Sequence, residues 1–270
     1  MLEARLERAS VLKKLLDAIK ELVTDANFDC TDSGIALQAM DNSHVALVAL
    51  LLRAQGFDHY RCDHSHSLGL SVKTLASIVK TAGNDDSLTI KSEEDGDVLN
   101  LIFASPDDKR VSEFDLKLMD IDAERLGIPE TDYDAIIKLS SAEFARICRD
   151  LLILNESVTI DCQKEHIKFT AAGDTGSGSI KLMPGSSVDD ERDEKDEKDK
   201  KKLSVPTQIT TKQAVVLTFS LKYLASFAKA TPLSETVTLM MSTDTPLVVE
   251  FKVDEVGYIR YYLAPKIDDA

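Results

Sequence analysis

Three potential metal ligands stand at alternate positions in the segment RCDHSH, which covers residues 61–66. Cysteine and histidine are ligands that zinc prefers, and alternate residues of an extended strand share one face. Cys62, His64 and His66 could therefore hold a metal if this segment were a strand. The sequence offers no obvious fourth ligand. We expect no metal site and no cofactor, and a hydrolase or metal enzyme is the alternative that these residues leave open.

Two other motifs resemble binding loops but lack essential residues. Asp120, Asp122 and Glu124 have the spacing of a calcium loop, yet Arg125 stands where that loop requires glycine. The glycine-rich stretch 173–179 lacks the Gly-Lys-Ser/Thr ending of a phosphate loop and better suits a turn that leads into an edge strand. No nucleophile, base and acid constellation is recognisable. We therefore expect a protein without catalytic residues.

Basic residues spaced seven apart are the more informative pattern. The predicted helices at 10–22, 71–83, 141–155 and 220–231 together carry a net charge of +5, whereas the rest of the chain carries −20. Residues seven apart lie on one helical face. Such a surface on an acidic protein is expected where helices meet a phosphate backbone, although each pair alone could be an ordinary solvated face. The pairs are Lys13 with Lys20, Lys73 with Lys80, and Lys222 with Lys229.

The elements that position these residues occur twice. Asp29 to Ala39 aligns with Asp161 to Ala171 at an offset of 132, and Ser71 to Lys80 aligns with Ser220 to Lys229 at an offset of 149. An apolar helical stripe repeats as well. Internal similarity on this scale predicts two copies of one structural unit. The stripe residues are Leu12, Leu15, Leu16 and Ile19 in the first copy, and Phe144, Ile147, Cys148 and Leu151 in the second.

Each copy reads as a strand, a helix, several strands, a second helix and three closing strands. The closing strands are predicted at 88–91, 98–103 and 111–118, and at 237–241, 247–253 and 258–263, from their period-two alternation. Strands far outnumber helices. This predicts an α+β fold of two tandem similar domains, with antiparallel sheets and four amphipathic helices on one face. The predicted domains cover 1–118 and 135–270.

Two connecting segments have unusual compositions. Residues 119–134 have no sustained period and are acidic, yet they hold the apolar Leu126, Ile128 and Pro129. This composition favours a strap that docks partners over a bare linker. Residues 189–202 consist only of charged side chains, which cannot form a core, so we expect a disordered insertion there.

Membrane insertion and disulfide bonding are not expected. No apolar run approaches the ~20 residues of a membrane span, and the first ten residues lack the apolar stretch of a signal peptide. The four cysteines have no close pairing, which is typical of small core residues in a reducing compartment.

Several motifs also resemble those of a known family. The chain is similar to the eukaryotic sliding clamps, the proliferating cell nuclear antigen family, over nearly its full length. The matching motifs are LKKLLDAIKEL, LQAMDNSHV, GFDHYRCD, LKLMDID, LGIPE, EFARICRDL, LVVEF and YYLAPKI. The resemblance implies a DNA polymerase processivity factor, a homotrimeric ring that encircles double-stranded DNA without reading its sequence. The helices would lie on the inner face of this ring and the sheets outside.

The resemblance also assigns residues to DNA binding and to subunit contacts. Val111 to Lys117 would pair with Gly176 to Met183 of a neighbouring subunit, which implicates Phe114 and Gly178. Phe114 replaces the tyrosine usual in the family, and Ser77 stands where animal clamps carry another lysine. The channel would be lined by Lys13, Lys14, Lys20, Lys80, Arg146, Arg149 and Lys229, with Lys73 and Lys222 as additions.

Partner peptides of this family dock beneath the strap. The resemblance implies partners that include the clamp loader, the replicative DNA polymerase, flap endonuclease and DNA ligase. It further implies ubiquitin or SUMO attachment at Lys164 and a nuclear location. The implied pocket residues are Met40, His44, Val45, Leu126, Ile128, Pro129, Pro246, Tyr262, Ala264 and Pro265.

Overall fold

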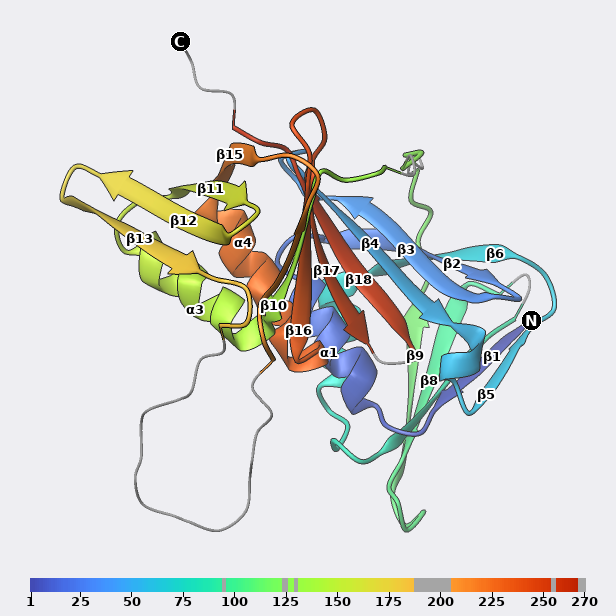
Figure 1. The fold of residues 1–270 in the computed structure, drawn as a ribbon. Helices are drawn as coiled ribbons and strands as arrows, with labels where there is room; N and C mark the ends of the chain where they lie inside the picture. Colours follow the sequence, from blue (N-terminus) through green and yellow to red (C-terminus); the bar gives the residue numbers. More distant parts are fainter. Residues whose placement is uncertain (94–95, 123–125, 129–130, 187–204, 254–255, 267–270) are drawn as a thin grey trace, which may run out of the picture. The chain divides into compact units, whose positions relative to one another are not determined.

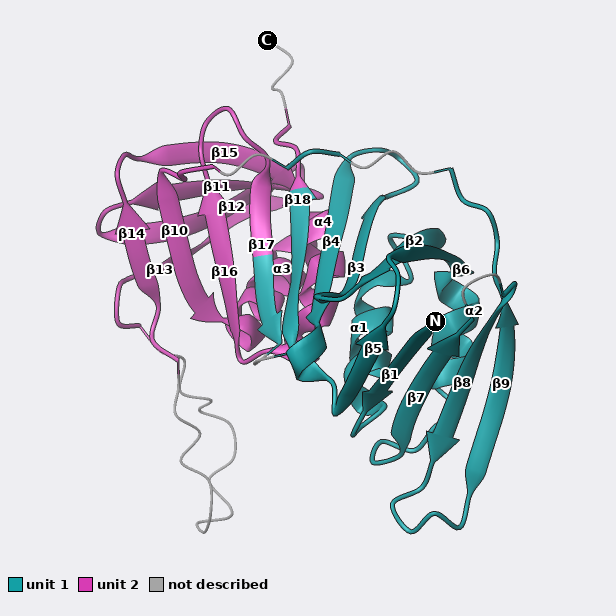
Figure 2. Ribbon diagram, turned by 90° about the vertical axis from the view of Figure 1, so that its right-hand side faces the viewer, with its two compact units in different colours: residues 1–130, 250–262 teal, residues 131–249, 263–270 magenta. Residues whose placement is uncertain are grey.

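The computed structural model describes residues 1–93, 96–122, 126–128, 131–186, 205–253 and 256–266. Pro129 and the predicted insertion at 189–202 therefore lie outside the described residues. The chain divides into two compact units, coloured separately in Figure 2. Unit 1 holds residues 1–130 with 250–262, and unit 2 holds residues 131–249 with 263–270.

Unit 1 contains two α-helices and two groups of antiparallel strands. One group has the order β5-β1-β7-β8-β9, and the other has the order β18-β4-β3-β2-β6. The elements are β1 (Leu2–Leu6), α1 (Ser10–Ile19), β2 (Asp25–Thr31), β3 (Gly34–Met40), β4 (Ala46–Arg53), a 3-10 turn (Ala54–Gly56), β5 (His59–Cys62), β6 (His66–Ser71), α2 (Val72–Val79), β7 (Ser87–Ser92), β8 (Val98–Ala104), β9 (Val111–Lys117) and β18 (Gly257–Leu263), with β17 (Leu247–Val253) from residue 250 on.

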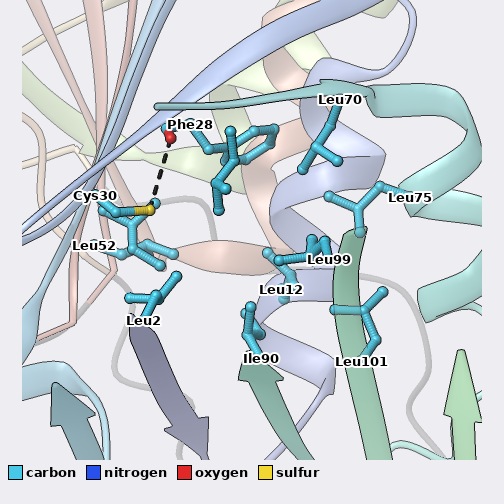
Figure 3. A pocket seen from close by; sticks show the side chains of 12 residues that line it. Leu2, Leu12, Phe28, Cys30, Leu52, Leu70, Leu75, Ile90, Leu99 and Leu101 are labelled. Atoms are coloured by element: carbon cyan, nitrogen blue, oxygen red, sulfur yellow. Dashed lines mark hydrogen bonds between the residues drawn. The ribbon is translucent and has the colours of Figure 1, made fainter. Parts of the chain in front are cut away.

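The core of unit 1 lies between these strands and the two helices. Figure 3 shows apolar side chains from β1, α1, β2, β4, β7 and β8 pointing toward one another. They line a cavity of about 30 Å³. Leu2, Leu12 and Leu101 are each at most 4% exposed there. The only polar contact drawn is the weak hydrogen bond from the Cys30 thiol to the carbonyl of Phe28, at 3.6 Å. Such an apolar cavity is part of a packed core and offers no ligand polar partners.

Unit 2 repeats this arrangement. One group of strands has the order β14-β10-β16-β17, and the other has the order β13-β12-β11-β15. Figure 1 shows α3 and α4 side by side next to β11, β12 and β13. The elements are β10 (Ala135–Ser140), α3 (Ser141–Leu152), β11 (Ser157–Gln163), β12 (His166–Gly173), β13 (Gly176–Leu182), β14 (Gln208–Thr211), β15 (Val215–Ser220), α4 (Leu221–Phe227), a 3-10 helix (Ala228–Leu233) and β16 (Thr236–Met241), with β17 through residue 249.

The predicted repeat is confirmed at the level of single core positions. All eight stripe residues of α1 and α3 are at most 4% exposed. At roughly 25 cal/mol per Å² of apolar surface removed from water, such stripes are what holds each helix to its sheets. The α+β class, the order of elements in both copies and the six closing strands are also confirmed, with strand ends within one residue of prediction.

The helices are shorter than predicted at their C-terminal ends. α1 ends at Ile19 rather than Leu22, and α2 ends at Val79 rather than Gly83. α3 ends at Leu152, and α4 passes into a 3-10 helix after Phe227. The apolar period continues past each end, but the backbone tightens to hydrogen bonds three residues apart. Examples are Leu22 N–H to the Ile19 carbonyl and Thr81 N–H to the Ile78 carbonyl.

The turn predicted near the glycine-rich stretch is confirmed, because β12 ends at Gly173 and β13 begins at Gly176. Gly176 adopts a φ of +158°, a conformation that favours glycine. Within the described part of the chain, no helix is long and apolar enough to span a bilayer.

Candidate nucleic-acid interface and partner-binding segment

The nine basic residues predicted to contact DNA all lie on the four α-helices or directly at their C-terminal ends. Lys20 and Lys80 are the C-caps of α1 and α2, where a positive charge is favoured by the helix dipole. Lys229 follows α4 in the 3-10 helix. None of the nine is buried. Lys13 and Lys20 are half-buried, and the other seven are exposed: Lys14, Lys73, Lys80, Arg146, Arg149, Lys222 and Lys229.

In unit 1 a carboxylate lies among these cations. Asp17 on α1 hydrogen-bonds the ammonium of Lys20, and its Oδ1 lies 3.4 Å from the Lys80 Nζ on α2. Partial burial acts to raise the pKa of Asp17, but the hydrogen bond and charge of Lys20 and the charge of Lys80 together lower it below its usual value. The hydrogen bond to Asp17 in turn raises the pKa of Lys20. Asp17 is therefore a carboxylate held in its charged form between two lysines.

In unit 2 the basic residues also have carboxylate neighbours. The Nε atoms of Arg146 and Arg149 lie 3.6 and 3.3 Å from the two carboxylate oxygens of Asp150. Lys222 forms an ion pair with Glu156 at 2.6 Å. The net charge of each helix does not show that these acids contact the basic residues. The i,i+3 spacing of Asp17 and Lys20 could have indicated one pair, whereas Asp17 and Lys80 are too far apart in sequence for any local pattern.

The described part of the strap is fixed to the sheet of unit 1 by hydrogen bonds. The Gln38 side chain on β3 receives the N–H of Leu126 and donates to its carbonyl, both at 2.8 Å. Asn27 on β2 donates to the carbonyl of Ile121 at 2.9 Å. Met119 donates to the carbonyl of Gly69 at 3.0 Å, and a Cβ on Gly69 would meet the Met119 carbonyl oxygen at 2.0 Å. Glycine at 69 is therefore required for the strap to approach this closely.

These contacts leave apolar side chains of the strap in solvent. Leu126 is 44% exposed and Ile128 is 38% exposed, although both belong to the more hydrophobic residue types. Because the bonds with Gln38 use only the backbone of Leu126, the side chain of Leu126 remains available. An apolar side chain held outward on a fixed backbone is suited to contact a partner.

A tight turn next to Gln38 presents two further residues of the predicted pocket. The carboxylate of Asp41 is almost fully buried and accepts the backbone N–H groups of Ser43, Val45 and Ala46, at 2.9, 2.8 and 2.7 Å. His44 has a φ of +56°, and Val45 is 39% exposed. Burial of Asp41 is compatible with its three charge-assisted hydrogen bonds. Asp41 thus fixes the backbone from which His44 and Val45 project.

The remaining pocket residues are divided between the two units. Met40 ends β3, and Tyr262 lies on β18, so both belong to the group of strands that carries the strap in unit 1. Pro246, Ala264 and Pro265 belong to unit 2. Lys266 follows them and is held twice: its N–H donates to the Thr218 carbonyl at 2.8 Å, and its ammonium donates to the Ser157 hydroxyl at 2.6 Å. The sequence gives no local signal for the contact between Lys266 and Ser157, because the two residues are 109 positions apart.

The residues assigned to subunit contacts lie on terminal strands. Phe114 is on β9, the last strand of its group, and packs edge-on against Phe103 with ring centroids 5.9 Å apart. Gly178 is on β13, also the last strand of its group, where a Cβ would meet the Leu154 side chain at 2.7 Å. Lys164 is exposed in the two-residue turn between β11 and β12.

The geometry proposed for a metal site is wrong. Cys62 ends β5, where it pairs with Leu2, whereas His66 begins β6, where it pairs with Cys30 in a different group of strands. The chain turns between them, so the three residues do not share the face of one strand. The Cys62 thiol and the His66 Nδ1 both contact the carbonyl of His64 instead. No group of three potential ligands is found among the described residues.

None of the three buried cysteines is an activated nucleophile. Cys30, Cys148 and Cys162 are buried, which confirms the prediction of small core residues, and Cys62 is half-buried. Burial raises the pKa of Cys148 to about 12 and that of Cys162 to about 11. A reactive cysteine needs a lowered pKa, because the thiolate is the nucleophile. These thiols therefore act as packing residues.

Comparison with known proteins identifies the family. Models of the N-terminal and C-terminal domains of proliferating cell nuclear antigen match residues 1–125 and 127–266. The proliferating cell nuclear antigen of Chaetomium thermophilum is 53% identical over 269 residues, which cover 100% of this chain and 99% of the relative. The chain belongs to the proliferating cell nuclear antigen family. The resemblance and the clamp fold predicted from the sequence are thereby confirmed.

Membership in this family also confirms the predicted function in its general form. The chain is a sliding clamp and a DNA polymerase processivity factor. Both matching models are those of clamp domains, and together they cover the repeat that the sequence revealed.

Proposed function

We propose that three copies of this chain form a closed ring, with duplex DNA passing through it and α1 to α4 facing the DNA. The observation that carries the proposal is the placement of nine cations on these four helices and their ends, in a protein whose formal net charge is −15. A polyanion is attracted to a segregated basic surface even when the whole protein is acidic. Contact through phosphates alone carries no sequence information, which suits a ring that must move along any DNA.

Terminal strands support closure into a ring. Among the described strands, β9 and β13 each have a neighbour on only one side, and Val111 on β9 is 61% exposed. An open strand edge is a pairing site for another chain, and head-to-tail pairing that closes leaves no such edge unpaired. We assign Val111 to Lys117 of one copy to pair with Gly176 to Met183 of the next, with Phe114 and Gly178 in the contact.

The strap provides the second proposed surface. Leu126, Ile128 and Val45 are exposed apolar residues on a backbone that Gln38 and Asp41 hold in place. We propose that short peptides of the clamp loader, replicative DNA polymerase, flap endonuclease and DNA ligase dock here. Their aromatic and aliphatic side chains would contact a pocket that also includes Met40, His44, Pro129, Pro246, Tyr262, Ala264 and Pro265. Short peptides bind well where a few apolar anchors enter a preformed site.

Three further assignments follow from the same family. We propose Lys164 as an attachment site for ubiquitin or SUMO, which its exposed position in the β11–β12 turn supports. We place the protein in the nucleus, in keeping with the name of its relative. We propose no catalytic residues and no cofactor, so that the ring acts by tethering its partners.

The DNA-facing assignment is tested by reversing one charge in each unit, with Lys80→Glu and Lys229→Glu in one variant. Retention of the loaded ring on closed circular DNA should fall, and the loss should be greatest at low salt, because each lost phosphate contact changes the salt slope by about 0.9. Solution mass should remain three times the 29.7 kDa of the chain.

The matched control is Lys91→Glu with Lys138→Glu, which makes the same change of charge on β7 and β10 instead of the helices. This control should keep normal retention. Equal retention of the helix variant and the wild type would contradict the DNA-facing assignment. A monomeric wild-type protein would contradict the ring itself.

A further inference from the structure

Carboxylates accompany more than half of the cations proposed to face DNA. Asp17 contacts Lys20 and Lys80, Asp150 contacts Arg146 and Arg149, and Glu156 contacts Lys222. A surface built only for tight phosphate binding would not place acids against its own lysines, because a DNA phosphate and a carboxylate compete for the same donors. The acids therefore reduce what each base can offer to DNA.

Asp17 connects the two helices of unit 1. It lies on α1 between Lys20, three residues ahead on the same helix, and Lys80 at the end of α2. The side chain of Asp17 is 42% exposed and that of Lys80 is 50% exposed, so solvent and an incoming phosphate can reach the group. Lys20 is only 24% exposed, and Asp17 limits the directions in which its ammonium can point. A phosphate therefore competes with Asp17 for the ammonium groups of both lysines.

We propose that Asp17 weakens the contact between the ring and DNA, competing with duplex phosphates for Lys20 and Lys80 so that the clamp can move along the duplex. The inference rests on the proposed function, because it requires both lysines to face DNA. A mobile ring needs many contacts that are each weak and quickly exchanged. An exposed ion pair alters an equilibrium by only about 1.4- to 5-fold, which suits exchange better than either a bare lysine or a buried pair.

Comparison of the two copies indicates that Asp17 is there for its charge and not for packing. At the offset of 132 the counterpart of Asp17 is Arg149, whose acidic partner Asp150 is the next residue. Each first helix thus has one aspartate shared by two bases, although the aspartates occupy different repeat positions. By contrast, the buried apolar residues of α1 and α3 occupy equivalent positions in the two copies, because both must pack against the same kind of core. An aspartate that contacts two bases occurs in both copies but at different positions, so packing alone does not explain it.

The test measures motion of the ring along stretched double-stranded DNA. Asp17→Asn keeps the size of the side chain and removes its charge. The diffusion coefficient of the loaded ring should fall by about 1.4- to 5-fold at low salt, and the difference should shrink as salt screens the freed lysines. Asp17→Glu, which restores the charge, should move as the wild type does.

Asp32→Asn is the matched control, because it removes one exposed carboxylate from the β2–β3 turn of the same unit. It should leave the diffusion coefficient unchanged. A lower thermal midpoint for Asp17→Asn with unchanged diffusion would make Asp17 only a tie between α1 and α2, and would overturn the proposal. Unchanged or faster diffusion of Asp17→Asn, while Lys80→Glu with Lys229→Glu still loses retention, would overturn it and leave the DNA-facing assignment intact. Normal retention of that double variant would overturn both.

Discussion

The two units have equivalent cores but different charge arrangements on their helices. Leu12 and Phe144, at equivalent positions, are both buried, whereas Asp17 and Arg149, also at equivalent positions, have opposite charges. In unit 1 the aspartate joins α1 to α2, and in unit 2 Asp150 contacts two arginines of its own helix. Packing thus constrains the buried positions of both copies in the same way. The exposed positions are free to carry whatever charge pattern the function requires.

The units also differ in how they hold a segment near their sheets. In unit 1 the side chain of Gln38 holds the backbone of Leu126. In unit 2 the residue equivalent to Gln38 is Thr170, and the segment held is the C-terminal one, through Lys266 to Ser157 and Thr218. The two copies of the structural unit therefore hold different segments through different residues. Neither set of hydrogen bonds could be predicted from the internal repeat.

The largest expected effect tests whether the cores are equivalent. Phe144→Ala should lower the free energy of unfolding by about 3–5 kcal/mol and Leu12→Ala by about 2–5 kcal/mol, because each leaves a cavity in a packed interior. Urea unfolding followed by far-UV circular dichroism measures both. The controls Lys14→Ala and Arg146→Ala replace exposed equivalent residues and should stay within about 0.5 kcal/mol. A near-neutral Leu12→Ala would show that the inner positions of the copies are not equivalent.

A smaller effect is expected at the strap. Gln38→Ala removes two hydrogen bonds to Leu126, each with a net value of about 0.5–1.5 kcal/mol. Hydrogen exchange at the Leu126 amide should become faster, and the affinity for a labelled DNA ligase peptide should fall by about 5- to 160-fold.

The equivalent substitution in the other unit, Thr170→Ala, is the control for the strap. It should change neither the exchange nor the affinity, since the side chain that holds Leu126 is Gln38 on β3. If Gln38→Ala bound the peptide as tightly as the wild type, the hydrogen bonds of Gln38 would have no part in presenting the strap.

The smallest effect is expected at the C-terminal segment. Ser157→Ala removes the acceptor of the Lys266 ammonium, while the backbone bond to Thr218 remains. Exchange at the Lys266 amide should therefore rise by only about 2- to 10-fold. Ser177→Ala, an exposed serine on β13, serves as the control. If the exchange rate were the same in both variants, the Lys266 ammonium would contribute nothing to holding this segment.

The sequence predicted the fold well because the repeated pattern records burial. The stripe from Leu12 to Ile19 and its counterpart identified the inner face of α1 and α3, and alternation identified the closing strands. Helix ends were predicted less well. An apolar period continues through a 3-10 turn such as that at Ile19, because the pattern of burial outlasts the α-helical hydrogen bonds.

The candidate sites were only partly predictable. The cations could be found because lysines seven apart share a face, but the Asp17–Lys80 pair joins two helices and has no local signature. The same limit explains the wrong strand geometry at Cys62 and His66, since the sequence did not show the turn that sends them to different groups of strands. Gln38 and Ser157 were missed because their partners are distant backbone and side-chain atoms.

Gln38 holds the strap through the backbone N–H and carbonyl of residue 126, which every amino acid except proline possesses. A mutation that changes the side chain at 126 therefore alters what the strap displays without loosening its attachment. The attachment of the strap and the side chain that it exposes are therefore separate properties. Evolution can change which partners the strap contacts while the fold that holds it stays the same.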